Sequence, residues 1–195
     1  MNTTSRAGRP RRLPPEERER SIVDGAVALA RESGLEALTV RAVAARVGVT
    51  PALVAHYRPV MDELVAEVFG VIVTDERDEV LGDIEVTGDL RDNLQRLIES
   101  LLDDSRNDAA VVWAQSWSLG ARNAALGRRV REEMDLWQRG LEDVIRRASH
   151  GTVDPEPAAW LLLALVDGMS AHSLVDWAPR DRSELARRTL SAVLA

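Results

Sequence analysis

Residues 39–57 have the sequence TVRAVAARVGVTPALVAHY, and this stretch decides the fold because it predicts two short helices that meet at a tight corner. Apolar residues recur at helical spacing in its first half, and Gly48 supplies the left-handed backbone that ends a first helix. Thr50 can cap a second helix through its hydroxyl. Pro51 is favourable at the first helical position, because the N–H that it lacks would have no partner there. Two helices joined in this way form a helix-turn-helix.

The second helix of this motif has an outward surface that suits the major groove of double-stranded DNA. Val54 has the spacing of a buried residue. The residues left on the outward surface include Pro51, Ala52, Leu53 and His56. Apolar side chains can pack on thymine methyl groups, and an imidazole can hydrogen-bond a base edge. We therefore expect base contacts from this helix and phosphate contacts from arginines beside it.

The same residues carry a resemblance to a known family. The stretch 39–50 resembles the motif of TetR-type bacterial transcriptional regulators, and the pair His56-Tyr57 is most similar to the BetI-like branch. The resemblance implies a three-helix head that binds a palindromic operator and a larger helical body that dimerises and binds a small-molecule effector. Arg58 stands where an aromatic residue is usual, and we expect it to contact phosphate, as we expect of Arg41. The expected DNA-binding residues are Arg41, Thr50, Pro51, Ala52, Leu53, His56, Tyr57 and Arg58.

Composition favours an all-α protein with a substantial core. Of the 195 residues 45% are hydrophobic, and Phe and Tyr occur only once each. Cysteine is absent, which excludes disulfides and thiolate metal sites and suits a reducing compartment. The longest apolar run, residues 158–166, is much shorter than the roughly 20 residues of a membrane span. We therefore expect no membrane partner and a cytoplasmic location.

Charge is distributed unevenly along the chain, whose net charge is −7. Residues 1–60 hold ten Arg and six acidic residues, whereas residues 61–195 hold fifteen Arg and twenty-six acidic residues. A basic front on an acidic remainder predicts a nucleic-acid-binding head on a body that stays away from phosphates.

We divide the chain into three parts. Residues 1–14 form a basic arm that we expect to be disordered alone, and that is either a solvated tail or a further contact with DNA. Residues 15–60 form the helix-turn-helix DNA-binding head, with a first helix over 15–33 that braces the motif. Residues 61–195 form the ligand-binding and dimerisation body. A long fourth helix begins the body and five more follow, which gives about nine helices in all.

Aromatic residues of the body are candidates for an effector pocket. Trp113 and Trp117 lie four residues apart on one helical face, and further large side chains lie on helices that we expect to converge there. The candidate lining residues are Phe69, Trp113, Ser116, Trp117, Met134 and Trp137. An ordinary hydrophobic core is the alternative explanation of this pattern. As a pocket, tryptophan faces in an acidic body would suit an apolar or cationic effector.

The run 158–166 is apolar on every side of a helix, which a helix covered on one side only cannot tolerate in water. It is either a central core helix, or a helix that lies between the core and a second copy of the chain. We expect a homodimer in which this helix and the last helix form a four-helix bundle across a two-fold axis. The expected interface residues are Trp160, Leu163, Asp167, Leu174 and Leu190.

No catalytic, metal or cofactor site is predicted. His172 and Asp176 lie four residues apart with Asp167 nearby, but the sequence has no third metal ligand at the required spacing and no nucleophile or glycine-rich phosphate motif. We therefore expect a transcriptional regulator and not an enzyme, most consistently a repressor that leaves its operator when a small molecule binds the body. The alternatives are a helix-turn-helix regulator without an effector and an enzyme on the helical body.

Overall fold

The computed structural model describes residues 13–82, 89–177 and 182–193, and within these ranges it has nine α-helices and no β-strand. The all-α prediction is confirmed. In chain order the helices are α1 (Pro15–Ser33), α2 (Val40–Val47), α3 (Pro51–Tyr57), α4 (Met61–Gly82), α5 (Leu90–Leu101), α6 (Asn107–Gly120), α7 (Ala124–Ser149), α8 (Pro155–Ser173) and α9 (Arg182–Val193). Two short 3-10 helices are η1 (Leu35–Ala37) and η2 (Asp104–Arg106). The predicted basic arm lies almost entirely outside the described residues.

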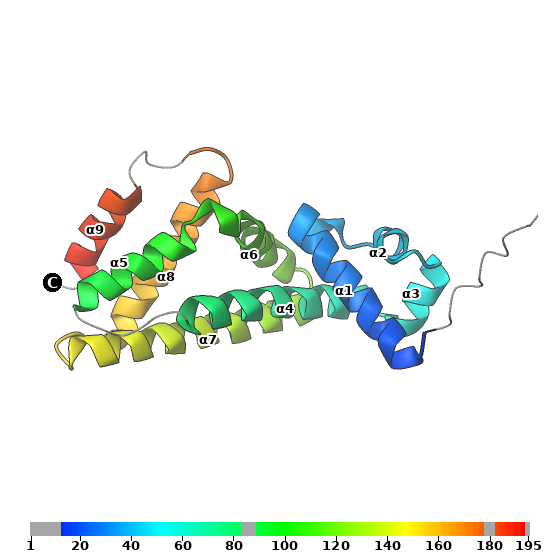
Figure 1. The fold of residues 1–195 in the computed structure, drawn as a ribbon, viewed down its shortest axis with the longest axis horizontal. Coiled ribbons are helices and arrows are strands. Elements are labelled where there is room, and N and C mark those ends of the chain that lie inside the picture. The colour runs from blue at the N-terminus through cyan, green and yellow to red at the C-terminus, as the bar shows by residue number, and fades with distance from the viewer. Residues whose placement is uncertain (1–12, 83–88, 178–181, 194–195) are drawn as a thin grey trace, which may run out of the picture.

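Helices α1, α2 and α3 form the head, at one end of the molecule (Figure 1). The hydroxyls of Thr39 and Thr50 cap α2 and α3, each accepting a hydrogen bond from the backbone N–H three residues on, at 3.1 and 3.3 Å. Gly48 ends α2 with φ 70°. A helix of seven residues has little stability of its own, so α3 depends on its completely buried Val54.

Helix α4 leads from the head into the body and packs against α7 (Figure 1). Glu133 of α7 is completely buried between them. Its Oε1 accepts a hydrogen bond from Thr74 Oγ1 at 3.1 Å and lies 2.7 Å from Nη2 of Arg129, while its Oε2 pairs with Nη1 of Arg77. We refer to these four residues as the Glu133 cluster. Because a buried carboxylate is costly without its partners, this cluster fixes α4 against α7.

The hydrophobic core consists of two clusters. The first extends from α1, α2 and α3 through α4 to α6 and α7, and includes the completely buried Ile22, Phe69 and Leu126. The second lies between α5, α7, α8 and α9 at the other end of the body. Since the first cluster continues across residue 60, the head is packed on the body and is not joined to it by a flexible linker.

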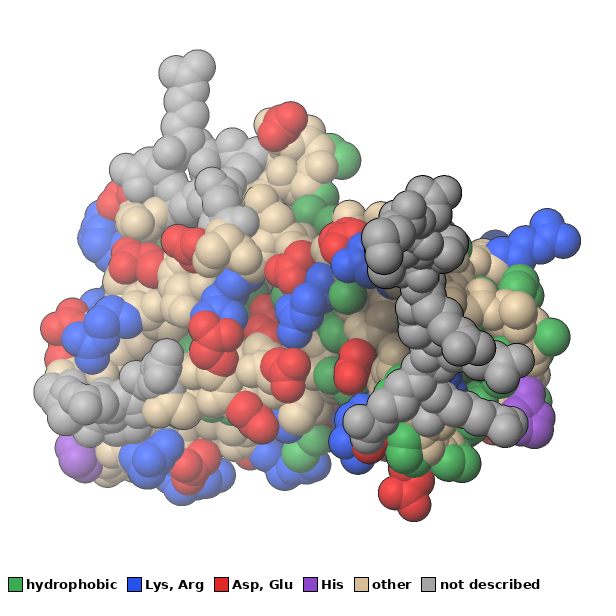
Figure 2. Space-filling view, turned by 45° about the vertical axis from the view of Figure 1, so that its right-hand side comes forward, with side chains coloured by type: hydrophobic (Ala, Val, Ile, Leu, Met, Phe, Trp, Pro, Cys, Tyr) green, Lys and Arg blue, Asp and Glu red, His purple; other side chains and the backbone are tan. Residues whose placement is uncertain are grey.

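The surface of the body carries many ion pairs between arginines and acidic residues. Figure 2 shows these two kinds of side chain interspersed over one face. Pairs within one helix include Arg147 with Asp143 at 2.9 Å and Arg188 with Glu184 at 2.7 Å. In each of these pairs a neighbouring carboxylate offsets the positive charge of the arginine.

Helices α6 and α7 approach closely at Gly120 and Gly127, where a Cβ on Gly127 would lie 2.6 Å from the Gly120 carbonyl oxygen. Gly127→Ala should force the two backbones apart and lower the free energy of unfolding by about 1–3 kcal/mol, measured by urea denaturation. Gly82→Ala is the control, since nothing lies within 4 Å of the added methyl. The control should change stability by less than about 0.5 kcal/mol. Equal stability of the two variants would contradict this account of the α6–α7 contact.

Candidate DNA-binding surface and effector pocket

The outer surface of α2 and α3 presents most of the predicted DNA-binding residues. Arg41, Thr50, Pro51, Ala52 and His56 are exposed, and Leu53 and Tyr57 are half-buried. The ring of His56 lies edge-on to that of Tyr57, with centroids 5.2 Å apart. The hydroxyl of Thr50 is already used in the cap of α3. The arrangement therefore offers one exposed imidazole, one exposed guanidinium and a small apolar surface at the start of α3.

The structure places Arg58 differently from its predicted role. Its guanidinium lies 2.8 Å from Glu67 of α4 and 3.3 Å from Glu19 of α1, and its side chain is mostly buried. We therefore withdraw Arg58 as an expected phosphate contact, because its charge already holds the end of α3 to α1 and α4. Glu19 and Glu67 are far away in the sequence, so no local pattern reveals this role.

A pocket lies in the body between α4, α6, α7 and α8, with a cavity of about 60 Å³. This is room for a few water molecules or a compact ligand. Its large side chains are Leu101 of α5, Arg106 of η2, Trp113 and Trp117 of α6, Met134 and Trp137 of α7, and Leu163 and Val166 of α8. The rings of Trp113 and Trp117 have centroids 6.2 Å apart. The tryptophans that form the wall therefore come from two different helices.

Two predicted pocket residues do not line the cavity. Phe69 is completely buried behind Trp113, with its ring edge-on at a centroid distance of 5.1 Å. Ser116 is also completely buried, and its hydroxyl donates a hydrogen bond to the Trp113 carbonyl oxygen at 2.8 Å. Both side chains contact Trp113 without reaching the cavity, so they support this part of the pocket wall.

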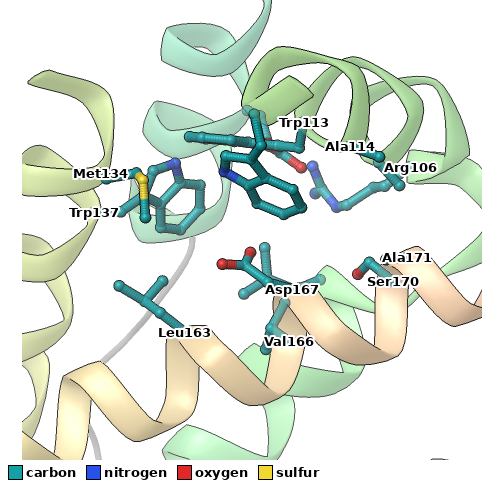
Figure 3. A pocket seen from close by; sticks show the side chains of 14 residues that line it. Arg106, Trp113, Ala114, Met134, Trp137, Leu163, Val166, Asp167, Ser170 and Ala171 are labelled. Carbon is teal, nitrogen blue, oxygen red and sulfur yellow. The ribbon is translucent and has the colours of Figure 1, made fainter. Parts of the chain in front are cut away.

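Two acidic residues add charge to this largely apolar pocket. Glu76 of α4 accepts a hydrogen bond from the indole N–H of Trp113 at 3.0 Å. The carboxylate of Asp167 extends from α8 toward the tryptophan rings (Figure 3). No hydrogen bond or ion pair joins Asp167 to another described residue. The pocket therefore combines aromatic faces with one engaged and one available carboxylate.

Burial perturbs both carboxyl groups. It raises the pKa of Asp167 to about 6, and the charge of Glu76 adds to this increase. Burial also raises the pKa of Glu76, although the hydrogen bond from Trp113 and the charge of Arg106 act in the opposite direction. A positive charge placed in the pocket would stabilise both ionised carboxylates.

The structure corrects the predicted dimer interface. Leu163 and Asp167 line the pocket, and Leu190 of α9 is completely buried inside the protomer. Leu190 has no surface left for a partner chain, and the half-buried Leu163 and Asp167 turn toward other helices of the same chain. Leu174 is half-buried, and Trp160 is exposed. The sequence does not distinguish the residues of α8 that face the pocket from those that face outward, because residues 158–166 are apolar on every side of the helix.

The described residues contain no group of three His, Asp or Glu side chains arranged to hold a metal ion. Within the same ranges, no helix has both the length and the apolar character that a membrane crossing requires.

Structural comparison identifies proteins with the same architecture. A transcriptional regulator from Rhodococcus sp. Rha1 is 29% identical with a TM-score of 0.76, over 90% of this chain and 95% of that chain. A regulator from Saccharomonospora viridis in complex with choline is 22% identical with a TM-score of 0.73, over 91% and 95%. The multidrug binding protein EbrR, complexed with proflavin, is 22% identical with a TM-score of 0.67, over 90% and 99%. The two likenesses at 22% identity show the fold alone.

Family models match both parts of the chain. Residues 22–68 match the bacterial regulatory proteins of the tetR family, and residues 90–195 match the C-terminal domain of BetI-type transcriptional repressors. A comparison with curated proteins gives no match. The two family matches cover the helix-turn-helix and the helices that form most of the pocket. The chain therefore belongs to the TetR family of DNA-binding transcriptional regulators, a non-enzymatic family, and has a BetI-type C-terminal domain.

Proposed function

We propose that this chain is a homodimeric repressor that binds a palindromic operator and leaves it when a small organic cation binds the pocket. The observation that carries the proposal is the carboxylate of Asp167, which is largely buried beside tryptophan rings and has no hydrogen-bond or ion-pair partner among the described residues. Aromatic faces and a carboxylate together recognise quaternary or protonated amines. A neutral ligand would leave the buried charge uncompensated.

Two structural relatives support this ligand class. One was crystallised with choline, a quaternary ammonium ion, and the other with the cationic dye proflavin. The cavity of about 60 Å³ favours the smaller of these two kinds of ligand. A three-ring dye would require the pocket side chains to move apart.

Helices α4 and α6 provide a route from the pocket to the head. Helix α6 carries Trp113 in the pocket, while its Asp108 accepts a hydrogen bond from Arg31 of α1 at 3.0 Å and its Gln115 accepts one from the Glu36 backbone N–H at 3.3 Å. Helix α4 carries Glu76 in the pocket, and its first half belongs to the core of the head. A ligand that moves either helix therefore changes the position of the head relative to the body.

We assign the dimer interface to the side of α8 that faces away from the pocket. Trp160 and Leu161 are 65% and 53% exposed there, although both are large apolar residues. A second copy of the chain would cover them, as the apolar run of α8 requires.

Choline is the first probe for the proposed effector. At saturation it should weaken operator binding by about 5–150-fold, the usual range of allosteric coupling, in a gel-shift titration on the operator found by genome-wide footprinting. Asp167→Asn should lower choline affinity at least about tenfold, because the anionic partner is lost. Asp135→Asn, on the exposed side of α7, is the control and should bind normally. If neither choline nor other small amines alter DNA binding, the chain is a regulator without a cationic effector.

Asp167 should reduce stability when no ligand is bound. Its folded-state pKa lies above the ordinary 3.8, so ionisation destabilises the folded protein, and this cost grows as pH rises from about 4 to 6. Asp167→Asn should therefore raise the free energy of unfolding by about 2–3 kcal/mol at pH 7.5, and by roughly half as much at pH 5. Urea denaturation at both pH values measures this. A gain that does not depend on pH would show that the charge of Asp167 is not its cause.

His56 and Arg41 should contribute differently to DNA binding. His56→Ala should cost about 1–3 kcal/mol on the operator and little on random DNA, because a base contact is lost. Arg41→Ala should weaken binding to both DNAs alike and reduce the salt slope by about one unit. Affinities for both DNAs across a salt series decide the matter. The assignment is reversed if Arg41→Ala changes sequence preference and His56→Ala does not.

Trp160→Glu should convert the dimer to monomers, because it places a charge in the proposed apolar interface. Sedimentation equilibrium at micromolar concentration gives the mass. Val60→Glu, at an exposed apolar residue outside α8, should remain dimeric. A wild-type chain that sediments as a monomer and still binds its operator tightly would refute both the dimer and the two-fold operator.

A further inference from the structure

Arg106 lies at a boundary between two cavities. A smaller cavity of about 10 Å³ adjoins the pocket and shares Leu101, Arg106, Ala110 and Ser170 with it. The exposed residues Asp103 and Asn107 also border this smaller cavity, so it leads toward the surface. Figure 3 shows Arg106 reaching from its own side of the pocket toward the tryptophan rings. A ligand that enters from this side passes the guanidinium.

Two groups hold Arg106 in this position. Its Nη2 and Nη1 donate to the carboxylate of Glu79 at 3.1 and 3.4 Å, and its Nε donates to the Ser100 carbonyl oxygen at 3.0 Å. The side chain is only 16% exposed, whereas Glu79 is 62% exposed. The charged partner of Arg106 is thus largely exposed, whereas the guanidinium itself is largely buried beside the pocket.

The charge of Arg106 also acts on the pocket itself. Glu76 and Glu79 lie three residues apart on α4 and so share one face of the helix. Arg106, paired with Glu79, interacts electrostatically with Glu76. A cationic ligand near Glu76 and Asp167 would therefore meet a positive charge that is already present.

We propose that Arg106 is a specificity-determining residue, an internal cation that a cationic effector must displace from the acidic side of the pocket. This inference rests on the proposed cationic effector. Like charges repel, so Arg106 lowers the affinity for every cation, and the effector has to compensate through its contacts with the tryptophans and Asp167. A neutral ligand of the same shape does not experience this competition.

The test compares choline with 3,3-dimethylbutan-1-ol, its uncharged isostere, by calorimetric titration. Arg106→Gln should raise choline affinity about fivefold, as expected for one partly exposed pair of charges, and leave that of the alcohol within about twofold. Arg106→Lys keeps the charge and should resemble the wild type. Arg122→Gln removes an exposed arginine from the turn before α7, and so controls for net charge. Glu79→Gln should weaken choline binding, because Arg106 then keeps the Ser100 carbonyl oxygen but loses its salt-bridge partner outside the pocket, so its charge acts more strongly on the pocket carboxylates.

The outcomes separate the two proposals. If Arg106→Gln raises the affinity for both ligands equally, or does not raise the affinity for choline, the proposal that Arg106 competes with a cationic effector is wrong. If Arg106→Gln does not fold, judged by circular dichroism, Glu79→Gln decides, and unchanged or tighter choline binding then refutes the idea. If wild-type protein binds neither ligand, the cationic effector is wrong, and quenching by caesium ions tests Arg106 independently.

The quenching experiment uses a Trp160→Phe, Trp177→Phe background, which leaves only Trp113, Trp117 and Trp137 to emit. Adding Arg106→Gln should increase quenching by caesium, a cation, at least about twofold and leave quenching by neutral acrylamide unchanged, because only the cation is repelled. Equal caesium quenching with and without Arg106 overturns the inference.

Discussion

The structure depends on one buried carboxylate, that of Glu133. Two guanidiniums and a hydroxyl surround it, and they come from both α4 and α7. Sliding one helix past the other would leave a buried charge without partners, which costs about 3–5 kcal/mol. On each helix a direct neighbour of a cluster residue lines the pocket. Met134 follows Glu133 on α7, and Glu76 precedes Arg77 on α4. The same constraint therefore sets the width of the pocket and the direction in which α4 leaves the body.

The parts that could be predicted from the sequence are those with local physical causes. The caps of α2 and α3, the left-handed Gly48 and the helical periodicities each involve residues a few positions apart. The roles that sequence reasoning missed are set by partners distant in the chain. Arg58 is paired with Glu19 and Glu67, and Asp167 turns toward α4 and α6. Trp113 and Trp117 were identifiable by their four-residue spacing on one helical face, but Glu76 resembles any other acidic residue on a charged helix until α6 and α8 bury it.

The polar groups of the pocket lower the stability of the folded protein. In or around one small cavity lie two carboxyl groups with raised pKa values. The buried indole N–H groups of Trp117 and Trp137 lie there too, and neither has an acceptor among the described residues. A core selected for stability alone would hold apolar side chains at these positions. Packing outside the cavity offsets this cost, because the first hydrophobic cluster and the Glu133 cluster hold α4, α6 and α7, and the second cluster holds α8.

The way α3 is held has an evolutionary consequence. Its fold needs the hydroxyl of Thr50 at one end, Val54 on the inner side and the salt bridges of Arg58 at the other end. The exposed positions between them, such as Ala52 and His56, contribute little to the core. On the proposed DNA-reading role of α3, substitutions at these positions change the target sequence and leave the fold intact. On that proposal, descendants of this chain can acquire new target sites through single substitutions on one two-turn helix while the rest of the molecule stays unaltered.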